Sequence, residues 1–230
     1  MILKSIVSTF FLATLLLTLI YLSLITFDDE NIILLAIALT LFASSGFSLG
    51  LFILSRHYRE ISLLEVSNIA LFTAFLFTTN YFAMLIPSLI YYILPAAAGI
   101  TFYFPASIFY GTFKKMCSRP GSSLLLLIGY GIVSEIFSPA IFWIPYYLAW
   151  GGFLEVHSAL SKDEEEIGFC HGFIFGLYGA GLALLYMLVA WGVYRPIFMA
   201  LPAVIIDGLL SALGFKIGEN IGRHIKSLQL

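Results

Sequence analysis

The sequence predicts an all-α integral membrane protein, a helical bundle of about eight transmembrane spans with both termini in the cytoplasm. Hydrophobic residues make up 61% of the chain and charged residues only 10%, whereas about 25% of residues are charged in an ordinary soluble domain. The mean hydropathy of +1.02 leaves too little polar surface to cover a soluble particle of 230 residues. We therefore expect a multi-pass protein of the cell membrane, in contact with lipid and without a nucleic-acid partner.

The span count and the orientation come from the apolar stretches and the positive charges between them. About 20 residues cross a hydrocarbon core of about 30 Å, so eight stretches fit, two of them short. With the N-terminus inside, ten of the eleven Lys and Arg residues are cytoplasmic and only Arg195 lies outside, as the positive-inside rule requires. The predicted spans are residues 5–27, 33–54, 63–86, 89–113, 121–137, 143–160, 167–193 and 197–221.

The first two spans differ in character from the rest. They contain no charged residue, and because charge inside a membrane usually marks a functional site, its absence argues against a transport path there. We interpret residues 1–60 as two N-terminal anchor helices that face lipid, and residues 61–230 as a separate bundle of six helices.

Small residues recur at helical spacing in the later spans. Ala70 and Ala74 lie four residues apart in the third span, which permits close approach of another helix. Prolines 95 and 105 are expected to break the fourth span. Two glycine series predict antiparallel packing of the seventh and eighth spans, with a docking surface for another membrane subunit as the alternative: Gly168, Gly172 and Gly176, then Gly214, Gly218 and Gly222.

Glu135 is the acidic residue that most invites a functional explanation. It lies near the outer end of the fifth span, among aromatic residues at the outer ends of neighbouring spans. One reading is an aromatic belt at the membrane surface. The other is a site for a flat, cationic ligand, held by charge pairing and cation–π contacts. The candidate ligand-binding residues are Glu135, Asn80, Tyr81, Trp143, Tyr146, Tyr147, Trp150 and Glu155.

Glu155 and Asp207 are predicted to lie deep in the bundle. Counting about 1.5 Å per residue from Trp143 places Glu155 about 18 Å below the outer surface, and Asp207 lies at a similar depth. An unpaired carboxylate there is costly, so each must face the bundle interior and find a partner. Two arrangements remain open: the two acids share a proton, or each meets Tyr or Ser hydroxyl groups.

Signals for catalysis or metal binding are weak. His157, Cys170 and His171 lie near the acidic run 163–166, but their spacing matches no zinc signature and a solvated loop explains the acids. The chain has no Gly-Lys-Ser/Thr phosphate loop, no His-Glu-x-x-His motif and no Gly-x-Ser-x-Gly elbow. We therefore predict no enzyme activity, no cofactor and no metal site.

Four stretches after residue 60 form an ordered set of motifs: 103–106, 118–124, 133–139 and 151–155. Together they resemble the substrate-binding S-components of energy-coupling factor (ECF) transporters, most closely the YkoE-type subfamily. Segment 118–124, Ser-Arg-Pro-Gly-Ser-Ser-Leu, resembles the family's cytoplasmic Arg-Lys-Pro-Gly-Ala-Ala turn, although no Lys follows Arg119. Glu135, followed by Ser-Pro at 138–139, resembles the glutamate and Gly-Ser-Pro that come next. Segment 151–155, Gly-Gly-Phe-Leu-Glu, resembles the Gln-Gly-x-x-x-Glu helix, with Gly151 in place of Gln and one residue fewer before Glu155. Segment 103–106, Tyr-Phe-Pro-Ala, also fits. Ala70 and Ala74 resemble the Ala-x-x-x-Ala motif that docks on the coupling subunit.

The resemblance implies a six-helix substrate-binding core over residues 61–230, with the two N-terminal spans as an addition. It implies capture of a small water-soluble vitamin, thiamine or its hydroxymethylpyrimidine precursor, for import powered by coupling and ATPase subunits on other chains. The alternatives are an intramembrane enzyme that uses acids or a metal, with Glu135, Glu155, His157 and Asp207, and a structural subunit of a larger membrane complex.

Overall fold

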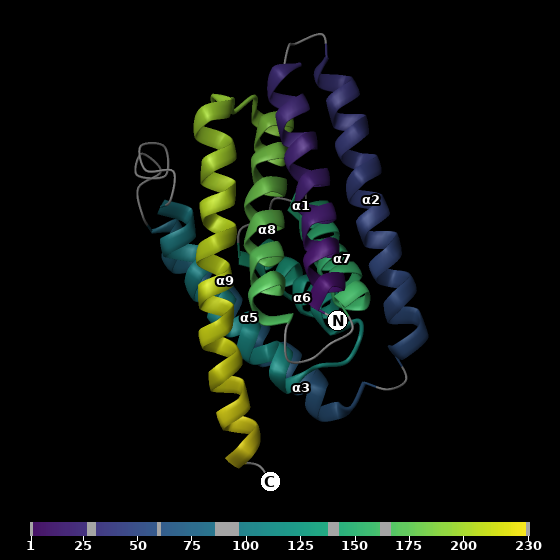
Figure 1. Cartoon of the computed structure of the whole chain (residues 1–230), viewed down its shortest axis with the longest axis vertical. Helices are drawn as coiled ribbons and strands as arrows, with labels where there is room; N and C mark the ends of the chain where they lie inside the picture. The colour runs from purple at the N-terminus through teal and green to yellow at the C-terminus, as the bar shows by residue number, and fades with distance from the viewer. Residues whose placement is uncertain are drawn as a thin grey trace.

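The computed structural model describes residues 2–26, 31–58, 61–85, 97–137, 143–161 and 167–228, and all regular secondary structure in these residues is helical. Figure 1 shows α1, α2, α8 and α9 running along the long axis of a single bundle. The elements are α1 (Ile2–Ile25), α2 (Ile32–His57), α3 (Leu63–Met84), the π-helical turn η2 (Gly99–Tyr103), α5 (Phe104–Met116), α6 (Ser122–Phe137), α7 (Ile144–Ser161), α8 (Ile167–Trp191) and α9 (Ile197–Leu228).

Five of the described helices are long and apolar enough to cross a membrane: α1, α2, α3, α8 and α9. This confirms the helical membrane class. Helix α6 is apolar but shorter, with 16 residues, so the count of eight spans stays a prediction. The longest helix, α9, has 32 residues and is therefore about 48 Å long. Its C-terminal turns extend past the residues at which α8 begins (Figure 1).

Helices α1 and α2 pack against the rest of the bundle. Helix α1 contacts α7 and α8, and its residues Leu16 and Ile20 are fully buried. Helix α2 lies along α7, where Gly46 lies close to the ring of Phe153 and to the backbone of Gly152. The division at residue 60 stays a prediction, but one face of each N-terminal helix is covered by protein rather than lipid.

The fourth predicted span changes its helical geometry at Pro105, while Pro95 lies outside the described residues. The wide turn η2 closes with a bond from the Phe104 N–H to the Gly99 carbonyl, and Pro105 follows in the first turn of α5. A proline has no N–H to donate, so it fits where one type of helix ends and another begins. Single π-helical turns within α-helices are frequently found at functional sites.

The glycine series divide between two helix contacts. The antiparallel packing of α8 and α9 is confirmed, and Gly172 lies where a side chain would collide with Phe215. The glycines of α9, however, face α5: a Cβ at Gly218 would collide with the carbonyl oxygen of Ile108. The prediction that both series meet each other was therefore wrong for α9. Its glycines instead let α5 and α9 approach closely.

Candidate functional site

An aromatic cluster occupies the interior near the start of α7. It contains four of the candidate ligand-binding residues, and adjacent ring centroids are 4.9 Å apart for Tyr146 and Tyr147 and 5.6 Å apart for Tyr146 and Trp150. Tyr146, Tyr147 and Trp150 are buried. They lie in the first two turns of α7, where their rings contact one another. We define the aromatic cluster as Trp143, Tyr146, Tyr147 and Trp150 together with Tyr103, Tyr130 and Tyr186.

The hydrogen bonds of the cluster fix two of its rings. The Tyr146 hydroxyl donates to the Gly179 carbonyl at 3.1 Å, and the Trp150 indole N–H donates to the Phe175 carbonyl at 2.9 Å. Both carbonyls belong to α8, inside a run of buried residues. Because a buried Tyr or Trp usually needs a polar partner, these bonds explain how α7 presents a rigid aromatic wall.

The other three outer-end candidates lie beside the cluster or away from it. Glu135 is half-buried near the end of α6 and acts electrostatically on Tyr147. Asn80 is half-buried on α3, whereas Tyr81 is 54% exposed and its ring lies 6.3 Å, centroid to centroid, from that of Phe77 on the same helix. Within the described part of the chain, Glu135 is thus the one of these three with a recorded interaction with a member of the cluster.

Glu155 lies in the second half of α7, level with the start of α6. Its side chain is completely buried. One carboxylate oxygen accepts the Gly121 N–H at 2.9 Å, and the other accepts the N–H groups of Ser123 at 2.5 Å and Leu124 at 3.3 Å. These are backbone N–H groups at the start of α6 that have no carbonyl partner within the helix. Among the described residues, neither arrangement predicted for Glu155 is found: it shares no proton with Asp207 and accepts no hydrogen bond from a hydroxyl group.

Local chemistry explains why Glu155 is needed there. Gly121 has φ of +92°, a left-handed conformation that favours glycine. Glycine at this position has no side chain to cap α6, so the carboxylate from α7 supplies the acceptor and its charge interacts favourably with the positive helix end. The depth of Glu155, counted along its own helix, did not indicate these partners, because the turn before α6 reaches into the bundle as far as Glu155.

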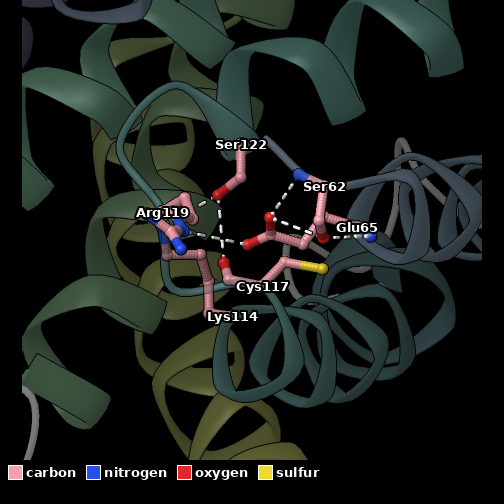
Figure 2. Close-up of polar contacts among 6 residues, drawn as sticks. All are labelled: Ser62, Glu65, Lys114, Cys117, Arg119 and Ser122. Atoms are coloured by element: carbon pink, nitrogen blue, oxygen red, sulfur yellow. Dashed lines mark hydrogen bonds and ion pairs between the residues drawn. The ribbon is translucent and has the colours of Figure 1, made fainter. Parts of the chain in front are cut away.

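The same turn is connected to the beginning of α3. Ser62 and Glu65 form a capping box, with Ser62 N–H to Glu65 Oε2 at 2.9 Å and Glu65 N–H to Ser62 Oγ at 3.2 Å. Figure 2 shows Glu65 between Ser62 and Arg119, and Arg119 Nε lies 3.7 Å from Glu65 Oε1. Across the turn, the Ser122 hydroxyl donates to the Cys117 carbonyl at 3.0 Å. The polar contacts of Glu65 thus join α3 to the turn that precedes α6.

Asp207 is buried apart from Glu155. It is 4% exposed and accepts a backbone hydrogen bond from Gly99 at the start of η2. Its Oδ1 atom has no hydrogen-bond partner among the described residues. The π-turn therefore brings a backbone donor to an acid on α9, and the two deep acids belong to separate parts of the bundle.

His157 and His171 form the centre of a buried polar chain. Their Nδ1 atoms are 2.9 Å apart, so one ring donates and the other accepts. The chain continues from His157 Nε2 to the Thr9 hydroxyl at 2.9 Å, and from His171 Nε2 to the Tyr110 hydroxyl at 2.8 Å. Tyr110 in turn contacts Ser123 at 2.9 Å. One ring therefore carries a proton on Nδ1, and the Nδ1 atom of the other ring accepts it as a hydrogen bond.

The contact between His157 and His171 could have been predicted from their positions relative to the link between α7 and α8, rather than from the spacing of metal ligands. His157 and His171 are equally distant from residue 164, the middle of the link between α7 and α8. In an antiparallel helix pair such residues lie at the same level, so a contact between the rings follows from the hairpin. Cys170, one residue away, is half-buried on a different face, and among the described residues no three His, Cys, Asp or Glu side chains form a metal-binding group.

Ala70 and Ala74 lie on the exposed side of α3. Ser67, Leu71 and Thr78 are exposed on the same helix, so this part of α3 is not covered by the described part of the chain.

Comparisons of this chain with protein-family models, with curated proteins and with solved structures found no match.

Proposed function

We propose that this protein is the substrate-capture subunit of an ECF-type importer for a small, cationic, water-soluble vitamin, thiamine or its pyrimidine precursor. The observation that carries the proposal is the bond set of Glu155 with Gly121, Ser123 and Leu124. It joins the two motif stretches that most resemble the family, the Arg-Pro-Gly turn and the Gly-x-x-Glu helix. Residues that are separated by about 30 positions in the sequence thus have one common structural role.

The proposed ligand site is the aromatic cluster with Glu135. Several aromatic faces and one carboxylate are the groups that hold a flat cation, and each favourable cation–π contact contributes about 0.5–2 kcal/mol. The half-buried position of Glu135 gives it access to the ligand while reducing its solvation. In this proposal Glu155, in the second half of α7, supports the helix arrangement through its bonds with the start of α6.

The proposed docking surface is the exposed face of α3 that carries Ala70 and Ala74. Small side chains let a helix of the coupling subunit approach closely. The ion pair of Glu65 with Arg119 links the first turn of this helix to the turn before α6. Uptake would then require coupling and ATPase subunits on separate chains.

The proposed orientation places both termini in the cytoplasm, with eight spans in the cell membrane. Support comes from the gathering of five Lys and Arg side chains of three helices, α2, α5 and α9, around one cavity. Such a concentration of positive charge at one end of the bundle is typical of a cytoplasmic end.

The test is ligand identification by mass spectrometry on the purified protein, followed by calorimetric titration with thiamine and a neutral pyrimidine analogue. We expect Glu135→Gln to weaken thiamine binding by one to two orders of magnitude, about 1.4–2.8 kcal/mol, with a smaller effect on the neutral analogue. Glu155→Gln should weaken binding less, and Tyr81→Phe, at an exposed position, serves as the matched control. Thiamine binding by Glu135→Gln as tight as wild type would place the ligand elsewhere.

A further inference from the structure

A cavity of about 800 Å³ opens at the end of the bundle where α2, α5, α7 and α9 terminate and α8 begins. We call this the basic cavity. Its volume falls within the range of small-molecule sites, about 300–1,000 Å³. Phe52, Ile53 and Phe215 form apolar parts of its wall, and Ser158 and His171 add polar groups. Its charged lining residues are Arg56, Lys114, Lys115, Glu155, Glu219, Arg223 and Lys226.

The lining carries more positive than negative charge. Of its two carboxylates, Glu155 is occupied by backbone N–H groups. Glu219 is 2% exposed and pairs with Lys115 at 3.2 Å and Arg223 at 3.8 Å, as well as with Lys216 outside the cavity at 3.1 Å. Its negative charge is therefore already shared among cations.

Three of the cations have no such compensation within the described part of the chain. Arg56 lies over the ring of Phe52 at 4.1 Å, and Lys114 contacts the Ser122 hydroxyl at 3.4 Å. Lys226, like these two, makes no ion pair with a described carboxylate. Like charges that line a partly enclosed space repel one another more strongly than they would in water, and an anion bound among them removes that cost.

We propose that the basic cavity binds a phosphate monoester, either the headgroup of an anionic lipid or a soluble phosphate ester. Arg and Lys side chains are the usual protein partners of phosphate, and basic pockets between membrane helices bind lipid headgroups. The positive-inside rule accounts for the side of the membrane on which these residues lie. It does not account for their convergence from three helices on one cavity. The inference does not depend on the proposed transport function.

The experiment uses the purified full-length protein and two probes with the same phosphate chemistry. Glycerol 3-phosphate is titrated by calorimetry at constant ionic strength, and phosphatidic acid retention from mixed micelles with phosphatidylcholine is followed by native mass spectrometry. The test variant is Lys114→Gln with Lys226→Gln. The control, Lys4→Gln with Arg195→Gln, removes the same charge at positions outside the cavity lining and away from Glu219. A single variant, Arg56→Gln, provides a second test if the double variant does not fold.

We expect the test variant to bind roughly 25-fold more weakly and Arg56→Gln about fivefold more weakly, since each cation beside an anionic group contributes about a factor of five. The control should change binding little. Binding of glycerol 3-phosphate identifies a soluble ester as a ligand, and retention of phosphatidic acid alone identifies lipid. Equal losses in the test and control variants, or binding of neither probe, would overturn the proposal. So would binding that appears only after the acids at 163–166 are replaced by their amides, because those acids would then be the natural occupants.

Discussion

Removal of the Glu155 carboxylate should cost more stability than removal of any other described acid that caps a helix. The side chain is completely buried, and it accepts hydrogen bonds at 2.9 Å and 2.5 Å from Gly121 and Ser123, with a longer one from Leu124. In Glu155→Ala these N–H groups stay buried but lose their acceptor. Gly121 cannot provide a replacement because it has no side chain.

The magnitude follows from the two shorter bonds. A hydrogen bond to a charged group contributes about 1.5–3 kcal/mol net, so Glu155→Ala should lower the free energy of unfolding by about 3–6 kcal/mol. Glu155→Gln keeps one acceptor oxygen and should lose about half of that. The comparison residue is Glu65, which caps α3 in a more exposed position. Loss of a cap there costs about 0.5–2 kcal/mol, and its ion pair with Arg119 contributes at most about 1 kcal/mol.

The assay is reversible unfolding of the purified variants by sodium dodecyl sulfate in mixed micelles, followed by circular dichroism. The expected order of stability is wild type, Glu65→Ala, Glu155→Gln and Glu155→Ala, from most to least stable. If Glu155→Ala unfolds no more readily than Glu65→Ala, the carboxylate does not hold the start of α6 and the reasoning about its role is wrong.

Three further predictions concern α3, the cysteines and the orientation. Ala70→Trp or Ala74→Trp should abolish co-purification with a coupling subunit while ligand binding is retained, and normal assembly would refute that docking surface. Cys117 is fully buried, and burial raises the pKa of its thiol to about 11. At pH 7.5 the half-buried Cys170 should therefore react with maleimide at least about tenfold faster than Cys117. Equal rates of the two thiols, measured by mass spectrometry, would contradict this. In intact cells an impermeant maleimide should label Tyr194→Cys but not Cys170, and labelling of Cys170 would invert the proposed topology.

The membrane class and most helix positions could be predicted because both depend on local composition. Apolar length fixes where a helix can cross lipid, and the expected end of the fifth span at residue 137 agrees with α6. Contacts between helices are less local. The glycines of α9 were assigned to α8, although they face α5, because a small-residue series shows that some helix approaches closely but not which one.

The partners of the buried polar residues could not be predicted, because they depend on contacts between segments that are far apart in the sequence. The depth of Glu155 was counted along one helix, whereas its partners come from a turn 31 to 34 residues earlier. The interior position of the acid could be predicted from the cost of its charge. Its neighbours could not, because the positive φ of Gly121 and the level at which α6 begins are properties of the folded chain.

The two buried carboxylates near the basic cavity are stabilised in different ways, and the difference has a consequence for ligand binding. Glu155 is held by backbone N–H groups, which no mobile anion can remove from the helix. Glu219 is held by side-chain cations, and two of them, Lys115 and Arg223, also line the cavity. A bound phosphate would compete with Glu219 for these side chains. Since Lys115 lies on α5 and Glu219 on α9, occupancy of the proposed site and the polar contact between these two helices are linked through shared cations.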